Sequence, residues 1–102
     1  MLHVIAIIEL NPNSRDSFLK EFQANVPAVR DEPGCIEYGP ALDAVTEIAA
    51  QSALGPDTVC IIEKWESVAA LEAHLAAPHM TAYRERVRDF VKQVRLHILQ
   101  PA

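Results

Sequence analysis

Five side chains that could line a binding site for an aromatic molecule lie close together in the second half of the chain. They are Glu63, Trp65, His74, His79 and Tyr83. The two imidazoles titrate nearest to neutral pH, and the indole and the phenol provide flat apolar surfaces with a polar edge. If the elements that carry these groups enclose one cavity, that cavity suits a planar aromatic ligand.

Each of these side chains also has a structural explanation, which the residues alone leave open. Trp65 can be an ordinary core aromatic, and Glu63 can pair with Arg95 on another strand. His74 can be a solvated helix residue and His79 a helix N-terminal cap. The spacing supports no Ser-His-Asp or Cys-His triad. The residues alone therefore predict a small oligomeric α+β domain with an apolar cavity.

Other kinds of site are not indicated by the motifs. His74 and His79 are five residues apart with Pro78 between them, so they do not share a helix face as zinc ligands four residues apart do. No metal site is therefore predicted. Cys35 and Cys60 belong to no CxxC or Cys–His arrangement, and we expect both to be reduced thiols. The three glycines form no phosphate-binding loop.

The composition is that of an ordinary globular protein. The 102 residues are 50% hydrophobic and 23% charged, with a net charge of −5, and we expect one domain over residues 1–102. An acidic chain without a Lys/Arg cluster is a poor candidate for nucleic acid or for anionic membranes. No apolar run is long enough to span a bilayer. The first residues do not resemble a secretory signal, so we expect a cytoplasmic protein.

Apolar periodicity predicts four strands and three helices. Strands are expected over residues 2–10, 35–38, 58–65 and 94–99. One helix is expected between the turns at 11–14 and 31–34, a short one from Ser67 to Pro78, and another with its apolar stripe running from Met80 to Phe90. Residues 41–48 are expected to continue the second strand past a bulge.

This order of elements predicts a ferredoxin-like α+β fold with an antiparallel sheet, in which the first and third strands are central. Those two strands are apolar on both faces, because Ile5, Ile7 and Ile62 oppose the residues that would face the helices. The helices can cover only one face. A second copy, packed sheet against sheet, is the simplest cover for the other, so we expect a homodimer or higher homo-oligomer.

Several segments resemble the antibiotic biosynthesis monooxygenase (ABM) family over nearly the whole chain. They are the Glu32-Pro33-Gly34-Cys35 turn, residues 56–67 (PDTVCIIEKWES), 71–75 (LEAHL), 77–83 (APHMTAY) and the ending at 98–101 (ILQP). They are most similar to the bacterial cofactor-independent quinol monooxygenase branch. The resemblance implies a dimeric α+β barrel, and chemistry without metal or flavin in which a quinol or hydroquinone reacts directly with dioxygen.

The resemblance also implies roles for individual residues. The implied catalytic residues are His74, His79 and Glu63, and the implied substrate-binding residues are Trp65, Tyr83, Met80 and Ile61. Either histidine would be the base or a hydrogen-bond donor, because imidazole titrates nearest neutrality. Glu63 would orient a histidine or a substrate hydroxyl. The tryptophan, the tyrosine and the methionine would form the slot for the ring.

The chain departs from other branches of the family at single positions. Arg84 and Ala6 stand where haem-degrading members have a haem-ligating histidine and an asparagine, and Ile61 stands where polyketide-modifying members have an asparagine. Val26 replaces a histidine of an isomerase branch that acts on a phosphorylated carbonyl compound. Two alternatives stay open: an ABM-fold isomerase of a small carbonyl substrate, and a non-catalytic dimeric ligand-binding or stress-associated module.

Overall fold

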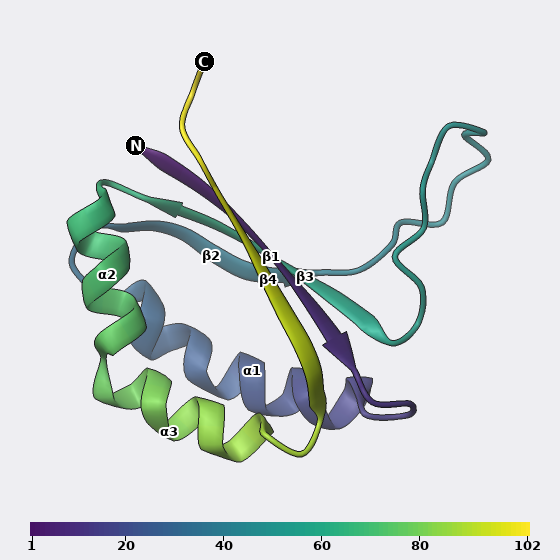
Figure 1. Cartoon of the computed structure of the whole chain (residues 1–102), viewed down its shortest axis with the longest axis horizontal. Helices are drawn as coiled ribbons and strands as arrows, with labels where there is room; N and C mark the ends of the chain where they lie inside the picture. The colour runs from purple at the N-terminus through teal and green to yellow at the C-terminus, as the bar shows by residue number, and fades with distance from the viewer.

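The computed structural model describes residues 1–102 and has one antiparallel sheet with three helices (Figure 1). The elements in chain order are β1 (Leu2–Leu10), α1 (Arg15–Arg30), β2 (Cys35–Ala41), β3 (Thr58–Trp65), α2 (Val68–Ala76), α3 (Pro78–Val87) and β4 (Val91–Leu99). The strand order is β2-β3-β1-β4. The predicted α+β, ferredoxin-like fold is confirmed, with the first and third strands at the centre. No helix has both the length and the apolar character needed to cross a membrane.

The two central strands present one fully buried face to the helices. Along β1 every second residue is buried, as the alternation of apolar side chains predicts. On β3 the buried face includes Ile61, Glu63 and Trp65. The register pairs Val4 with Glu63 and Ala6 with Ile61. A carboxylate therefore lies in the middle of the apolar layer between sheet and helices.

Helix α1 supplies the aromatic part of this layer. Its apolar stripe at spacings of three and four residues faces inward, and Phe18 and Phe22 are fully buried. The ring of Phe22 stacks on Tyr38 of β2 at a centroid distance of 5.3 Å and meets the edge of Tyr83 of α3 at 5.9 Å. Figure 1 shows α1 and α3 side by side. Together they hold aromatic side chains against β2.

The turn between α1 and β2 packs tightly against the start of α2. Gly34 has a φ of +86°, and a Cβ at this position would lie 2.6 Å from the Cβ of Ala70. The amide of Glu66 donates to the carbonyl of Gly34 at 2.9 Å. Ser67 caps α2 as predicted, because its side chain accepts from the amide of Ala70 at 3.1 Å. These contacts fix Glu32 of the turn beside α2.

Three predicted element boundaries are wrong, the first being the start of the last strand, which begins at Val91 and not at residue 94. The second strand ends at Ala41, which pairs with Cys60 near the start of β3, so a strand over 41–48 would have no neighbour to satisfy its amides. Residues 42–57 instead form a loop that projects from the body of the molecule (Figure 1). Helix α3 ends at Val87, and Phe90 lies in the following turn, where its amide donates to the carbonyl of Val87 at 2.9 Å.

Candidate active site

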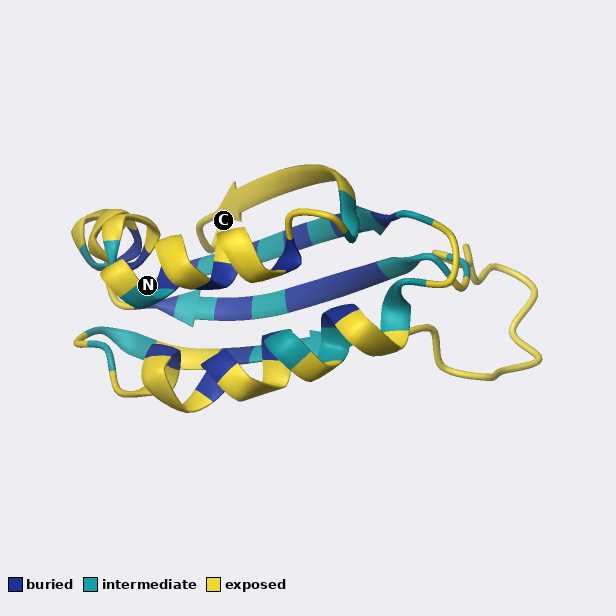
Figure 2. Cartoon of the chain, turned by 90° about the horizontal axis from the view of Figure 1, so that it is seen from below, coloured by how far each residue is buried: buried dark blue, intermediate teal, exposed yellow.

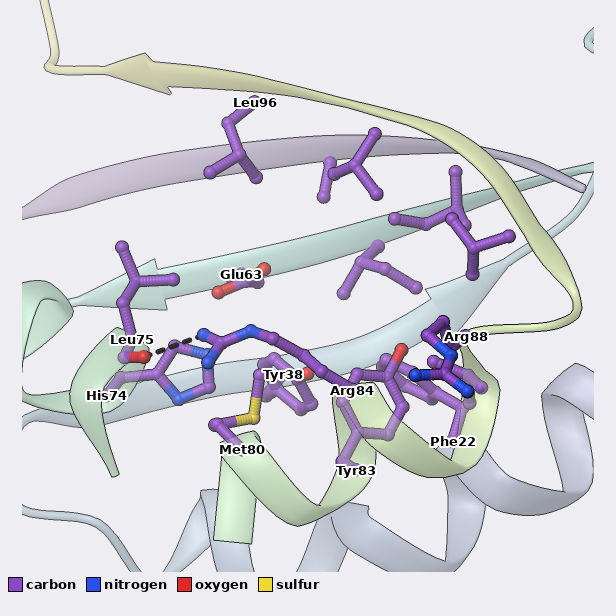
Figure 3. A pocket seen from close by; sticks show the side chains of 16 residues that line it. Phe22, Tyr38, Glu63, His74, Leu75, Met80, Tyr83, Arg84, Arg88 and Leu96 are labelled. Carbon is purple, nitrogen blue, oxygen red and sulfur yellow. Dashed lines mark hydrogen bonds between the residues drawn. The ribbon is translucent and has the colours of Figure 1, made fainter. Parts of the chain in front are cut away.

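An apolar cavity of about 420 Å³ lies between the sheet and the helices (Figure 3). Most of the side chains around it are hydrophobic, and the polar ones are Tyr38, Glu63, His74, Tyr83, Arg84 and Arg88. The strands contribute Ala6, Ile8, Ile61, Val91, Val94 and Leu96, and the helices contribute Phe22, Leu75, Met80 and Val87. A cavity of this size with a few convergent polar groups is typical of small-molecule sites.

His74 is a buried histidine in the wall of this cavity. Its Nδ1 lies 2.8 Å from Oε2 of Glu32, and its ring packs on Trp65 at a centroid distance of 4.6 Å. Burial lowers the pKa of His74, and the adjacent Glu32 carboxylate only partly offsets that effect. The imidazole is therefore neutral at pH 7. The carboxylate holds the proton on Nδ1, which leaves Nε2 as the atom able to accept a proton from a ligand.

His79 shares the same carboxylate from the other side. Its Nε2 lies 2.9 Å from Oε2 of Glu32. Its side chain is 31% exposed, whereas that of His74 is 2% exposed. His79 is not part of the cavity wall. Glu32 thus connects a histidine at the cavity with a histidine near solvent.

The same three residues have the donor types of a metal site. Their nearest ligand atoms, from Glu32, His74 and His79, all lie within 4.8 Å of one another, and two imidazoles with one carboxylate can bind a divalent transition metal. The sequence spacing did not indicate this set, because the carboxylate comes from a distant turn. The same three side chains also satisfy one another without a metal, because Glu32 Oε2 lies 2.8 Å from His74 and 2.9 Å from His79.

Glu63 faces the cavity from β3 with its charge poorly solvated. Its Oε1 accepts a hydrogen bond from Nε1 of Trp65 at 2.9 Å, so this indole, and not Arg95, is its partner. Burial raises the pKa of Glu63 to about 7, with a further rise from Glu32 and an opposing effect of the indole hydrogen bond. Near neutral pH the carboxyl is present in both protonation states and can donate or accept.

The two tyrosines of the cavity keep their protons at any physiological pH. Burial raises the pKa of both Tyr38 and Tyr83, and the nearby Glu63 adds to the rise. Each phenol therefore remains a hydrogen-bond donor. Figure 3 shows the hydroxyl of Tyr83 directed from α3 towards the sheet side of the cavity. Such a donor can bind a ligand oxygen that carries developing negative charge.

The structure brings most of the predicted site residues into one cavity, but not all of them. Ile61, Glu63, His74, Met80 and Tyr83 line it. Trp65 and His79 do not. The indole is fully buried beside the imidazole of His74 and behaves as a support for it.

Sequence reasoning missed three residues, Glu32, Tyr38 and Arg84, as parts of the site. The sequence places Glu32 only in the turn that ends the first helix. The Glu-Pro-Gly-Cys sequence of that turn was the one available signal for it, and it gave no hint of the two histidines.

Met80 is fixed in the cavity by the amide of Asn25, which donates to its Sδ at 3.4 Å.

This fold and this cavity define a member of the antibiotic biosynthesis monooxygenase family. The family model matches residues 1–86, so the chain belongs to that family of monooxygenases. The chain is 45% identical over 103 aligned positions to the probable quinol monooxygenase YgiN of Escherichia coli K12, covering 99% of this chain and 98% of that protein. The resemblance noted in the sequence is confirmed.

Solved structures give the same result at greater sequence distance. A crystal structure of an antibiotic biosynthesis monooxygenase superposes with a TM-score of 0.82 at 26% identity, covering 100% of this chain and 99% of that one. The structure of PA3566 from Pseudomonas aeruginosa superposes with a TM-score of 0.80 at 25% identity, covering 99% and 93%.

Proposed function

We propose that the protein is a quinol monooxygenase in which the substrate itself, and no cofactor, reduces dioxygen. The observation that carries the proposal is a neutral, buried imidazole, held by the carboxylate of Glu32, in the wall of an apolar cavity. Such a cavity suits a flat hydroquinone ring, and the base at its wall suits removal of a hydroxyl proton. The 45% identity to a probable quinol monooxygenase supports the same substrate class.

The first step is removal of a proton from the quinol. Nε2 of His74 accepts the hydroxyl proton, and Glu32 stabilises the imidazolium that forms. His79 contacts the same carboxylate oxygen and is more exposed, so it gives the proton a path towards solvent. Burial of His74 and the low exposure of Glu32 strengthen the charge interaction between these two side chains.

In the remaining steps the quinol and dioxygen are the only reactants, and hydroxyquinone and water are the products. The quinolate passes one electron to dioxygen, which gives a semiquinone and superoxide. These combine at an unsubstituted ring carbon, and protonation yields a hydroperoxide. Loss of the proton on that carbon breaks the O–O bond. One oxygen atom stays on the ring as the hydroxyl group of a hydroxyquinone, and the other leaves as water.

The polar groups on the other walls fit these charge changes. The phenol of Tyr83 donates a hydrogen bond to a quinolate or peroxide oxygen. Glu63, with a pKa of about 7, can supply the proton that the peroxide takes up. Met80 and Ile61 provide apolar contact for the ring.

We further propose that the working unit is a homodimer in which a second copy covers the outer face of the sheet. Ile5 and Ile62 lie opposite each other there and are only partly buried. The edge strand β4 is exposed over most of its length (Figure 2), and Leu96 and Leu99 are about half exposed on its two faces. An apolar sheet face next to an apolar edge strand is typical of a subunit interface.

The test is the fate of labelled oxygen. Reduced 2-methyl-1,4-naphthoquinone is mixed with the protein under ¹⁸O₂, with a reaction lacking protein to measure autoxidation. We expect one dioxygen consumed per quinol, and a hydroxyquinone that carries one ¹⁸O atom. Unlabelled quinone with hydrogen peroxide would mean a simple oxidase, and no reaction above the blank would mean a binding module. Activity should persist after dialysis against EDTA, and its loss would contradict the cofactor-free mechanism.

A further inference from the structure

One arginine in the cavity wall has no acidic partner. Arg84 follows Tyr83 on α3, and its Nη2 donates to the carbonyl of Leu75 at 2.6 Å. No carboxylate lies within 4.0 Å of its guanidinium. Figure 3 shows the side chain lying along the helix side of the cavity, with the guanidinium beside Leu75 and His74. Because a guanidinium has five donors, most of its hydrogen-bonding capacity is left for a ligand.

The neighbouring arginines are engaged by acidic side chains instead. Arg86 pairs with Glu21 of α1 at 3.0 Å and takes no part in the cavity wall. Arg88 lines the cavity but also lies 3.3 Å from Glu85. In a chain with a net charge of −5, an unpaired cation against apolar walls is unusual. Arg84 is also exposed to solvent, so an anion at this position would be held by direct charge-assisted hydrogen bonds to the guanidinium rather than by a poorly screened field.

The opposite wall restricts where an anion can sit. Glu63 projects from β3 on the sheet side, across the cavity from Arg84 (Figure 3). A negative group is therefore disfavoured near the sheet and favoured near α3. A ring in the cavity would place its reacting hydroxyl at His74 and a charged substituent at the guanidinium of Arg84. The two groups are neighbours, because Arg84 contacts Leu75, the residue after His74 on α2.

We propose that the preferred substrates are hydroquinones that carry an anionic substituent, a carboxylate on the ring being the simplest, and that Arg84 binds this group as a forked ion pair. This inference rests on the proposed quinol monooxygenase function and names the substrate class within it. Neutral hydroquinones would still enter the apolar cavity. They would bind without the charge-assisted hydrogen bonds of the guanidinium, which are about twice as strong as neutral ones.

Binding is tested first, without turnover. The probes are 1-hydroxy-2-naphthoate and 1-hydroxy-2-naphthamide, which share a ring and a phenol and differ in charge, and titration calorimetry measures both. We expect the wild type to bind the naphthoate tenfold or more tighter, Arg84→Gln to bind the two alike, and Arg84→Lys to keep part of the preference. Arg86→Gln is the matched control on the same helix and should keep the full preference. Equal binding by the wild type, or a preference that survives in Arg84→Gln, would overturn the proposal.

Turnover separates this inference from the proposed function. Reduced 2-carboxy-1,4-naphthoquinone and its methyl ester are compared by kcat/KM, and the acid should be favoured tenfold or more in the wild type but not in Arg84→Gln. If both are consumed at equal kcat/KM, the monooxygenase function stands and the charge selection is wrong. If neither is consumed while the naphthoate preference depends on Arg84, the quinol chemistry is wrong and the anion site stands.

Discussion

The Nδ1 atom of His74 lies 2.8 Å from Oε2 of Glu32, although 42 positions separate the two residues in the chain. The contact depends on how closely the turn after α1 approaches α2. The carbonyl of Gly34 accepts from the amide of Glu66 at 2.9 Å. This hydrogen bond holds the turn beside the start of α2, the helix that carries His74. The carboxylate then determines which ring nitrogen carries the proton, and so which nitrogen can act as a base.

The two histidines should contribute unequally to catalysis. His74→Ala removes the base at the cavity wall and should lower kcat by about 10²–10⁴-fold, the usual range for a positioned acid–base group. His79→Ala removes only the outer contact of Glu32 and should lower kcat less, by about tenfold. Initial rates of oxygen uptake with reduced 2-methyl-1,4-naphthoquinone measure both. A larger loss in His79→Ala than in His74→Ala would show that His74 is not the base.

Replacing Glu32 should move the acid limb of the pH–rate profile. The pKa of His74 is lowered by burial, so activity should be lost on acidification at a pH below 6.5, the usual value for histidine. The charge of Glu32 opposes this lowering. In Glu32→Gln the pKa of His74 falls further, and the acid limb should shift to lower pH while kcat decreases. A shift to higher pH would contradict the assignment of His74 as the base.

The sequence was sufficient to predict the helix-facing residues of the central strands. Alternate positions on β1 and β3 must point to one face, and the apolar residues there mark the core. The same period predicts that Ile61, Glu63 and Trp65 share one face of the third strand. Burial of His74 was not predictable in this way, because its position on α2 fitted a solvated residue equally well.

Other features depend on contacts between segments that are distant in the chain. Glu32 reaches His74 and His79 only because the turn packs on α2, and no spacing along the chain encodes that approach. The expected strand over 41–48 is absent for a related reason. β-Propensity does not show where the pairing with a partner strand stops, and the last residue of β2, Ala41, pairs with Cys60, two residues after β3 begins at Thr58. Trp65 is expected to form the slot, but it does not line the cavity. Strand alternation shows that its side chain faces inward and does not show that it packs behind His74.

Glu63 should make the stability of the protein depend on pH. Below pH 4.5 the carboxyl is protonated in the folded and the unfolded chain alike. As the pH rises towards 7, the unfolded chain loses this proton while the folded chain keeps it, so the free energy of unfolding falls. A shift of the pKa from 4.5 to about 7 corresponds to a loss of about 3 kcal/mol, which is complete once the pH exceeds the folded-state value.

The Glu63→Gln variant isolates this contribution, because the amide does not titrate. Urea unfolding of both proteins between pH 4 and pH 8 gives the difference in their free energies of unfolding. We expect the wild type to lose stability relative to the variant across that range. A difference that does not change with pH would show that the buried carboxyl titrates normally.

The proposed dimer predicts that a lysine on the outer sheet face changes the oligomeric state, whereas a lysine in the 42–57 loop does not. Ile62→Lys places a cation on the outer sheet face opposite Ile5 and should convert a species of twice 11.3 kDa into a monomer, because a buried unpaired charge is strongly disfavoured. Val45→Lys, at a fully exposed position of the 42–57 loop, is the matched control and should leave the dimer intact. Analytical ultracentrifugation measures both, and a wild-type protein that sediments as a monomer would exclude the interface.

Two glycine substitutions should separate backbone strain from the close packing that holds Glu32 in place. Gly34 and Gly55 both have a positive φ, +86° and +94°, and alanine in that region costs about 1–2 kcal/mol. Only at Gly34 does the added Cβ also meet a neighbour, the Cβ of Ala70 at 2.6 Å. Overpacking of this kind adds about 1–3 kcal/mol.

Gly34→Ala should therefore have the lower Tm of the two variants, by several degrees for each kcal/mol in a chain of this length. It should also lower kcat in the folded protein, because the turn must move away from α2 and withdraw the carboxylate from His74. Gly55→Ala, with open space around the new methyl group, should keep the wild-type kcat. Thermal unfolding and oxygen uptake measure the two effects. If Gly34→Ala lost stability but kept full activity, the link between this turn and the base would be disproved.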